Sequence, residues 1–171
     1  MGELSSPAVQ FDHFYAYDEI DTFVRGLAEA FPGLCRLSSI GQSREGRDIH
    51  LLTLADLTAA NPDELPAYVI HGGIHAHEPA STHGPLFTAQ KLLENHERAG
   101  LLSRMAFHIL PRLCPDSSEL SIATSTRIRS RTDFTKRAVN TIYPEDLDGD
   151  GLILTIRQEH PDGEFVVDQV D

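Results

Sequence analysis

The first half of the chain alternates between helical and strand patterns of apolar residues. Across residues 18–31, apolar side chains recur at helical spacing, acidic residues stand early in the run, and proline and glycine follow it. This pattern predicts an amphipathic helix. Two β-prone apolar runs, residues 35–40 and 49–54, flank a polar segment with two glycines. These runs predict a β-hairpin.

The next segments predict an α/β fold. A short unbroken apolar run at residues 67–70 predicts a central strand buried on both faces. Helical spacing over residues 81–97, followed by Gly100, predicts a second helix, and residues 105–110 predict another strand. This order of elements predicts a mixed central sheet flanked by helices, with binding sites just beyond the strand ends.

Composition and charge limit the class of protein. With 171 residues, 40% of them hydrophobic and 23% charged, the chain suits one soluble domain with a core. No apolar run approaches the roughly 20 residues that cross a bilayer, and no secretory signal pattern opens the chain. We therefore expect a cytoplasmic protein without a membrane partner. The net charge of −12 disfavours nucleic acid as a partner.

Cysteines and the last segment add little chemistry. Cys35 and Cys114 lie far apart without a metal-type or redox spacing, so we expect two buried thiols in a reducing compartment. Beyond residue 140 the pattern indicates loops and a hairpin that pairs residues 152–156 with residues 165–167.

The candidate chemistry lies at residues 69–79, where the 67–70 strand runs into a glycine-rich turn. His75 and Glu78 are three residues apart and offer an imidazole nitrogen and a carboxylate, which suit a catalytic zinc. The His-x-x-Glu spacing alone is weak evidence in a chain with nine histidines. The succession of strand, two glycines, ligand pair, proline and helix gives the pair its weight.

Three motifs, in the same order, resemble the zinc carboxypeptidase family. Residues 17–20 (Tyr-Asp-Glu-Ile) resemble the start of its first helix, and residues 41–49 resemble its Gly-x-Ser-x-Glu-Gly-Arg-x-Ile hairpin. Residues 73–78 resemble its Gly-Ile-His-x-x-Glu zinc turn. Residues 114–117 (Cys-Pro-Asp-Ser) are a degraded counterpart of the family's Asn-Pro-Asp-Gly, and an arginine-rich segment follows.

The resemblance implies a zinc-dependent hydrolase that acts on peptide or protein substrates. His75 and Glu78 would hold the zinc ion, which polarises the scissile carbonyl and lowers the pKa of its bound water. An arginine from the basic segment would stabilise the developing oxyanion. We choose Arg129 for this role, with Arg127 and Arg131 as competitors.

Three further histidines lie close to these positions or on neighbouring strands. His77 stands where many members of the family carry an arginine, and we expect it to support the ligands or to pack in the core. We expect His71 and His108, each on a strand, to be packed histidines rather than ligands.

Several parts of the family's site are not identified in the 171 residues. These are a later histidine ligand, a glutamate general base, and an Asn-Arg pair that binds the substrate carboxylate. His160 and Glu159 lie in a polar loop, so neither is assigned to these roles. We therefore expect residues 1–171 to form the N-terminal part of a single catalytic domain, incomplete on its C-terminal side and inactive or nearly so alone.

Other readings stay open. Asp146, Asp148 and Asp150 alternate around a glycine turn that resembles half of a calcium loop, although Arg157 occupies the position of the expected glutamate. Zinc-dependent deacylases of the aspartoacylase and succinylglutamate desuccinylase type use a similar glycine-rich turn. A non-catalytic binding module on the same fold is a third alternative. The 41–49 hairpin and the first helix favour the carboxypeptidase, and the oligomeric state is not predicted.

Overall fold

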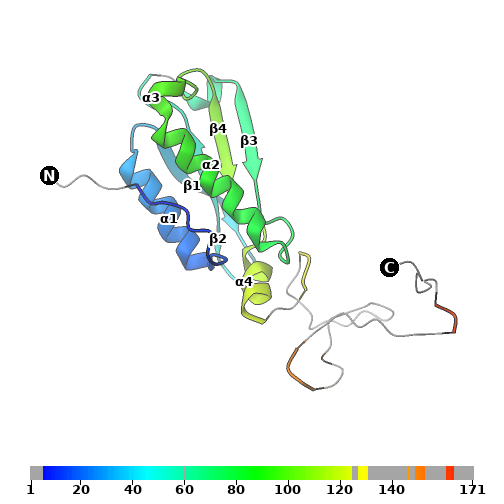
Figure 1. Ribbon diagram of the computed structural model, residues 1–171. Coiled ribbons are helices and arrows are strands. Elements are labelled where there is room, and N and C mark those ends of the chain that lie inside the picture. The colour runs from blue at the N-terminus through cyan, green and yellow to red at the C-terminus, as the bar shows by residue number, and fades with distance from the viewer. Residues whose placement is uncertain are drawn as a thin grey trace, which may run out of the picture.

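The protein forms one sheet with helices against it (Figure 1). The computed structural model describes residues 6–59, 61–124, 127–130, 146, 149–152 and 161–163. The elements, in chain order, are α1 (Tyr17–Ala30), β1 (Cys35–Gln42), β2 (Asp48–Leu54), η1 (Pro62–Glu64), β3 (Ala67–His71), η2 (Pro79–Thr82), α2 (His83–Glu94), α3 (His96–Ala99), β4 (Ala106–Leu110) and α4 (Pro115–Thr124).

The described sheet has four strands in the order β1-β2-β4-β3. Strand β2 pairs antiparallel with both β1 and β4, whereas β3 and β4 run parallel. The sheet is therefore mixed, as the order of elements predicts. Parallel pairing also brings the carboxyl ends of β3 and β4 to the same edge, which is where the glycine-rich turn begins.

Helices α1 and α2 lie side by side on one face of the sheet (Figure 1). Each helix buries one side because its apolar residues recur every three or four positions. The core side chains come from both helices and from β2 and β4, and the largest of the fully buried ones include Ile20, Leu27, Leu52, Leu54, Leu86, Leu93 and Ile109. Each such side chain contributes about 2 kcal/mol of burial free energy.

The position of β3 differs from the prediction. It was expected to be central and buried on both faces, but in the described sheet it is an edge strand that pairs only with β4. Tyr68 and Val69 are 58% and 59% exposed. His71 is also exposed, so the expectation that it packs is wrong, whereas His108 in β4 is partly buried beside Thr53. An apolar run predicts a strand, but it does not reveal how many strands flank it.

The helices between the strands also differ in detail. The single helix predicted over residues 81–97 is divided into η2, α2 and the short α3, with a break at Asn95. Gly100 ends the helical segment, as predicted, and it adopts the left-handed conformation. Helix α4 was not predicted at all, because its first residues were interpreted only through their likeness to Asn-Pro-Asp-Gly.

The two cysteines are free and have different surroundings. Cys35 is buried, and this burial raises the pKa of its thiol to about 12. Cys114 is only partly buried, contrary to expectation, and its thiol donates to the Ile74 carbonyl at 3.2 Å.

Two expectations made from the sequence concern other parts of the chain. The predicted pairing of residues 152–156 with 165–167 lies outside the described residues. None of the helices that the structure describes is long and apolar enough to cross a membrane.

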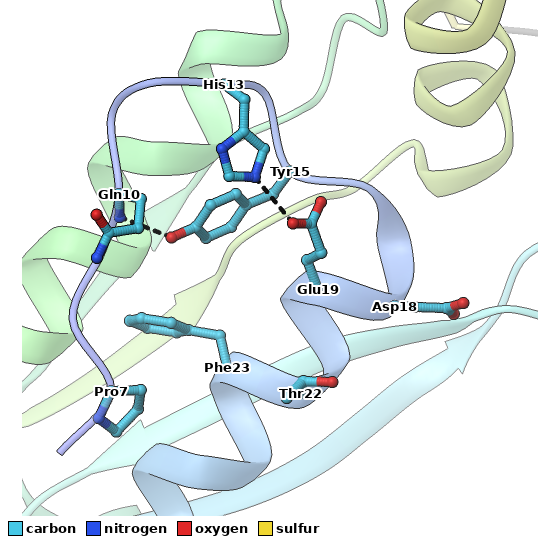
Figure 2. Close-up of a pocket in the computed structure, with 8 residues that line it drawn as sticks. All are labelled: Pro7, Gln10, His13, Tyr15, Asp18, Glu19, Thr22 and Phe23. Carbon is cyan, nitrogen blue, oxygen red and sulfur yellow. Dashed lines mark hydrogen bonds and ion pairs between the residues drawn. The ribbon is translucent and has the colours of Figure 1, made fainter. Parts of the chain in front are cut away.

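The N-terminal segment before α1 packs on both helices. The Val9 amide donates to Gln90 Oε1 of α2 at 2.9 Å. Figure 2 shows His13 pointing at Glu19 of α1. His13 Nε2 lies 2.8 Å from Glu19 Oε1. Both residues line a cavity of about 390 Å³. His13 Nδ1 also lies 2.8 Å from Asp12 Oδ1. The two carboxylates raise the pKa of His13, with Glu19 the larger cause.

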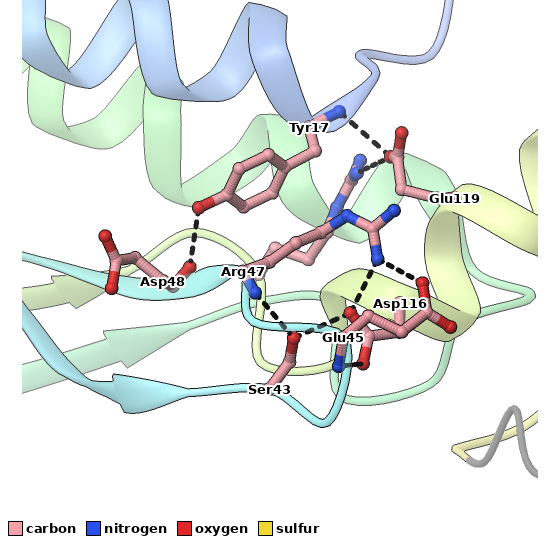
Figure 3. Close-up of polar contacts among 8 residues, drawn as sticks. Tyr17, Ser43, Glu45, Arg47, Asp48, Asp116 and Glu119 are labelled. Carbon is pink, nitrogen blue, oxygen red and sulfur yellow. Dashed lines mark hydrogen bonds and ion pairs between the residues drawn. The ribbon is translucent and has the colours of Figure 1, made fainter.

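Helix α4 is attached to the β1–β2 hairpin by an aspartate (Figure 3). Asp116 accepts hydrogen bonds from Ser43 Oγ and Arg47 Nη1, both at 2.7 Å, and from the Glu45 amide at 3.1 Å. Burial opposes ionisation of Asp116, but the bonds from Ser43 and Arg47 keep its pKa below the usual value. The polar residues of the 41–49 motif thus bind the start of α4.

We expect Asp116→Ala to destabilise the fold by about 2–4 kcal/mol, because three donors lose a charged acceptor. Urea unfolding followed by circular dichroism measures this change. The exposed Asp63 provides a matched control, and Asp63→Ala should change the free energy of unfolding by less than about 0.5 kcal/mol. Equal stabilities for the two variants would show that the Asp116 contacts contribute nothing.

We expect His13 to titrate above the ordinary histidine value of about 6.5. Because its folded pKa is raised, the stability that it contributes is present below the unfolded pKa and is lost as the pH rises through the folded pKa. Proton NMR of the imidazole measures the pKa. Glu19→Gln should lower it, whereas Glu29→Gln on the same helix should not. A pKa at or below 6.5 in the unmodified protein contradicts the assignment.

Candidate metal centre

The segment after β3 turns sharply over the end of β4. We call residues 72–78 the ligand turn. The Gly72 amide donates to the Leu110 carbonyl at 2.9 Å, and the Leu113 and Cys114 amides donate to the carbonyls of Gly72 and Gly73. The ligand turn therefore starts beyond the carboxyl ends of two parallel strands, where the sequence predicts a site.

Both glycines of the ligand turn are required by close packing. A Cβ atom on Gly72 would lie 2.1 Å from the Ser81 carbonyl oxygen and 2.9 Å from that of Pro111. Gly73 has φ +58°, and a Cβ atom there would lie 2.8 Å from Arg112 Cγ. No side chain fits between the two backbones, so the turn rests directly on the segment that follows β4.

The structure brings the two predicted ligands together. His75 Nδ1 lies 3.3 Å from Glu78 Oε2, and the Glu78 amide donates to the His75 carbonyl at 3.1 Å. The side chains are 25% and 52% exposed, so both are accessible from solvent. An imidazole nitrogen and a carboxylate oxygen at this separation can bind one metal ion between them after small side-chain rotations.

His77 lies beside the pair and is oriented by the backbone. Its Nδ1 is 3.2 Å from the Ile128 carbonyl, which can only accept, so Nδ1 carries the proton of this bond. Its Nε2 lies 3.7 Å from Glu78 Oε1, and its ring is stacked on His75 with 6.0 Å between centroids. This arrangement agrees with the expected supporting role.

Residues 127–130 lie against the ligand turn. The Ala76 amide donates to the Arg129 carbonyl at 2.6 Å, and Ile128 is buried. The Arg129 backbone is therefore next to the candidate ligands, and Arg127 and Arg129 are both exposed. Arg131 lies outside the described residues. The oxyanion role of Arg129 stays a prediction.

Arg112 is a buried charge below the ligand turn that the sequence analysis missed. Its side chain is 2% exposed and donates to Thr82 Oγ1 at 3.2 Å, Glu119 Oε1 at 3.0 Å and the Tyr15 carbonyl at 2.6 Å. Burial lowers its pKa to about 10, so the guanidinium stays charged at neutral pH. Arg112 directly follows an apolar strand and a proline in the sequence, and this position could have identified it as a buried charge at the strand end.

The donor set fits part of a zinc site. Protein zinc sites take three or four donors of the His, Cys, Asp or Glu type. His75 and Glu78 supply two such donors, and no group of three or more of these side chains that could hold a metal ion occurs among the residues that the structure describes.

The predicted calcium loop gains no support. Asp146 already accepts from the amides of Gly149 and Gly151 at 2.7 and 2.9 Å, and Asp150 accepts from the Leu152 amide at 2.8 Å. These contacts of the two aspartates are thus with backbone amides of the turn. Asp148 lies outside the described residues.

The chain matches a family model and individual proteins. A model described as zinc carboxypeptidase matches residues 20–148. Human carboxypeptidase D is 27% identical over 186 aligned residues, which cover 92% of this chain and 14% of that protein. The inactive metallocarboxypeptidase ECM14 of Paracoccidioides lutzii is 31% identical over 110 residues, which cover 62% of this chain and 19% of that protein. The chain thus spans only a small part of either relative.

A solved structure supports the fold. Carboxypeptidase A from Helicoverpa armigera superimposes with a TM-score of 0.64 at 24% sequence identity, covering 71% of this chain and 29% of that one. The mixed α/β arrangement described above is therefore shared with a carboxypeptidase domain.

We expect Gly72→Ala to destabilise the fold by at least about 2 kcal/mol, because the new methyl group would overlap two carbonyl oxygens. Gly84 in α2 is the matched control, since a Cβ atom there meets nothing within 4 Å. Gly84→Ala should be neutral or stabilising, by up to about 1 kcal/mol. Thermal unfolding compares the two, and a fully stable Gly72→Ala variant would show that the backbones are not in contact.

Proposed function

Since this chain belongs to the zinc carboxypeptidase family, we propose that His75 and Glu78 are protein ligands of a zinc ion in a peptide hydrolase. The substrates would be peptides or proteins, cleaved at the carboxyl end. The observation that carries the proposal is the 3.3 Å approach of His75 Nδ1 to Glu78 Oε2 on an exposed turn beyond the strand ends. The matched family favours this activity over the deacylase alternative.

Each residue around the pair has a separate role in this proposal. Zinc, when bound, polarises a carbonyl group and lowers the pKa of a bound water toward about 7. His75 and Glu78 would hold the ion, and the His77 ring, stacked on the His75 ring with 6.0 Å between centroids, would support its orientation. Arg129, whose backbone borders the turn, would donate to the developing oxyanion.

A second candidate function is metal or peptide binding without catalysis. It is favoured by the two-donor count among the described residues, and one relative is itself named inactive. Incubation of this chain with zinc and a peptide that has a free carboxyl terminus tests this alternative. Release of the last residue, detected by mass spectrometry, would contradict a binding module without catalysis.

We expect His75→Ala and Glu78→Ala each to weaken zinc binding at least tenfold, because each removes one of two protein donors. Isothermal titration with zinc chloride measures the affinity. His71→Ala is the matched control, since this histidine is exposed on the neighbouring strand β3 outside the pair. Its affinity should equal that of the unmodified chain. Unchanged binding in both ligand variants would falsify the metal assignment.

A further inference from the structure

We propose that Ser81 is a positioning residue for the metal ligands, because its hydroxyl joins the two ends of the ligand turn. The inference rests on the proposed zinc site. Ser81 Oγ accepts from the Gly73 amide at 3.0 Å and donates to the Glu78 carbonyl at 2.6 Å. A hydroxyl has one proton and two lone pairs, so it makes both bonds at once.

Ser81 also contacts the turn through its backbone. Its amide donates to the Glu78 carbonyl at 3.0 Å, so that one oxygen receives two bonds from the same residue. Its own carbonyl oxygen would overlap a Cβ atom placed on Gly72. Ser81 therefore contacts the turn at Gly72, Gly73 and Glu78.

The residue after Ser81 is bonded to the buried arginine. Ser81 precedes Thr82 in η2, and Thr82 is fully buried and accepts from Arg112 Nε. The contacts run from Arg112 through Thr82 and Ser81 to Glu78. The hydroxyl is the last of these contacts before the ligand.

The Glu78 carboxylate depends on this support more than the fold does. Its side chain is 52% exposed, and its ion-pair contacts in the described structure are with the imidazoles of His75 and His77. The direction of its side chain is therefore set by the backbone at Glu78, which has the non-helical angles φ −116° and ψ 60°. Ser81 is only partly buried and its hydroxyl bonds to Gly73 and Glu78, so loss of the hydroxyl acts on the ligand turn.

The test measures zinc affinity by isothermal titration in Ser81 variants, with zinc chloride as the probe. Ser81→Ala should weaken binding about five- to tenfold, as the loss of a hydrogen bond of about 1 kcal/mol to a ligand-bearing turn predicts. Ser81→Thr keeps the hydroxyl and should bind within twofold of the unmodified chain. Ser103→Ala is the control, since Ser103 is exposed and bonds only to Gly100 in the described structure.

Ser81→Val and Ser81→Thr form a second matched pair, since they have nearly the same volume and differ in the hydroxyl. This pair tests the role of the Ser81 hydroxyl even if Ser81→Ala does not fold. Weaker zinc binding in the valine variant than in the threonine variant, with similar unfolding temperatures of the metal-free proteins, supports positioning. Equal affinities for the pair overturn it.

The ligand variants separate the two levels of the proposal. If His75→Ala and Glu78→Ala lose zinc but Ser81→Ala and Ser81→Val bind normally, the positioning role is wrong and the zinc site stands. If none of these variants changes zinc affinity, the zinc site itself is wrong, and the positioning role is overturned with it.

Discussion

The candidate site depends on direct contact between two stretches of backbone. Gly72 and Gly73 lie against the segment at Pro111 and Arg112, with no space for a Cβ atom between them. Hydrogen bonds from Gly72, Leu113 and Cys114 continue the parallel pairing of β3 and β4 past the strand ends. The turn that carries His75 and Glu78, the candidate ligands, therefore begins as an extension of the sheet. Strand pairing fixes where this turn starts.

Two buried polar residues attach α4 and the N-terminal segment to the rest of the fold. Arg112 joins the N-terminal segment, η2 and α4 below the turn, and Asp116 joins α4 to the β1–β2 hairpin. A buried charge costs free energy unless its hydrogen bonds are made. Arg112 and Asp116 therefore favour the packing of α4 in which their hydrogen bonds form over other compact packings that would leave the charges unpaired. In the described part of the chain, the polar residues of the 41–49 motif that bond to Asp116 thus bind α4 and not the candidate metal ligands.

The sequence predicted the elements with regular periodicity. Helix α1, the hairpin, β4 and the helix end at Gly100 follow from local patterns. The close approach of His75 to Glu78 agrees with their spacing after a strand, and their role as metal ligands stays a prediction. The edge position of β3, the break at Asn95, the partial exposure of Cys114 and the buried Arg112 were not predicted. The positions of β3, Cys114 and Arg112 depend on contacts between residues far apart in the chain, which periodicity does not contain. The break at Asn95 is local, since the Asn95 side chain donates to the Lys91 carbonyl. Helix α4 was missed because its amphipathic pattern is weak.

The long-range bonds of Arg112 and Glu119 have a consequence for how the protein is made. Arg112 binds the Tyr15 carbonyl, and Glu119 accepts from the Tyr17 amide at the start of α1. A nascent polypeptide emerges from its amino end, so residues 15–17 are synthesised long before Arg112 and Glu119. Contacts of such wide sequence separation also slow folding. The start of α1 therefore gains these two hydrogen bonds only after α4 has been synthesised.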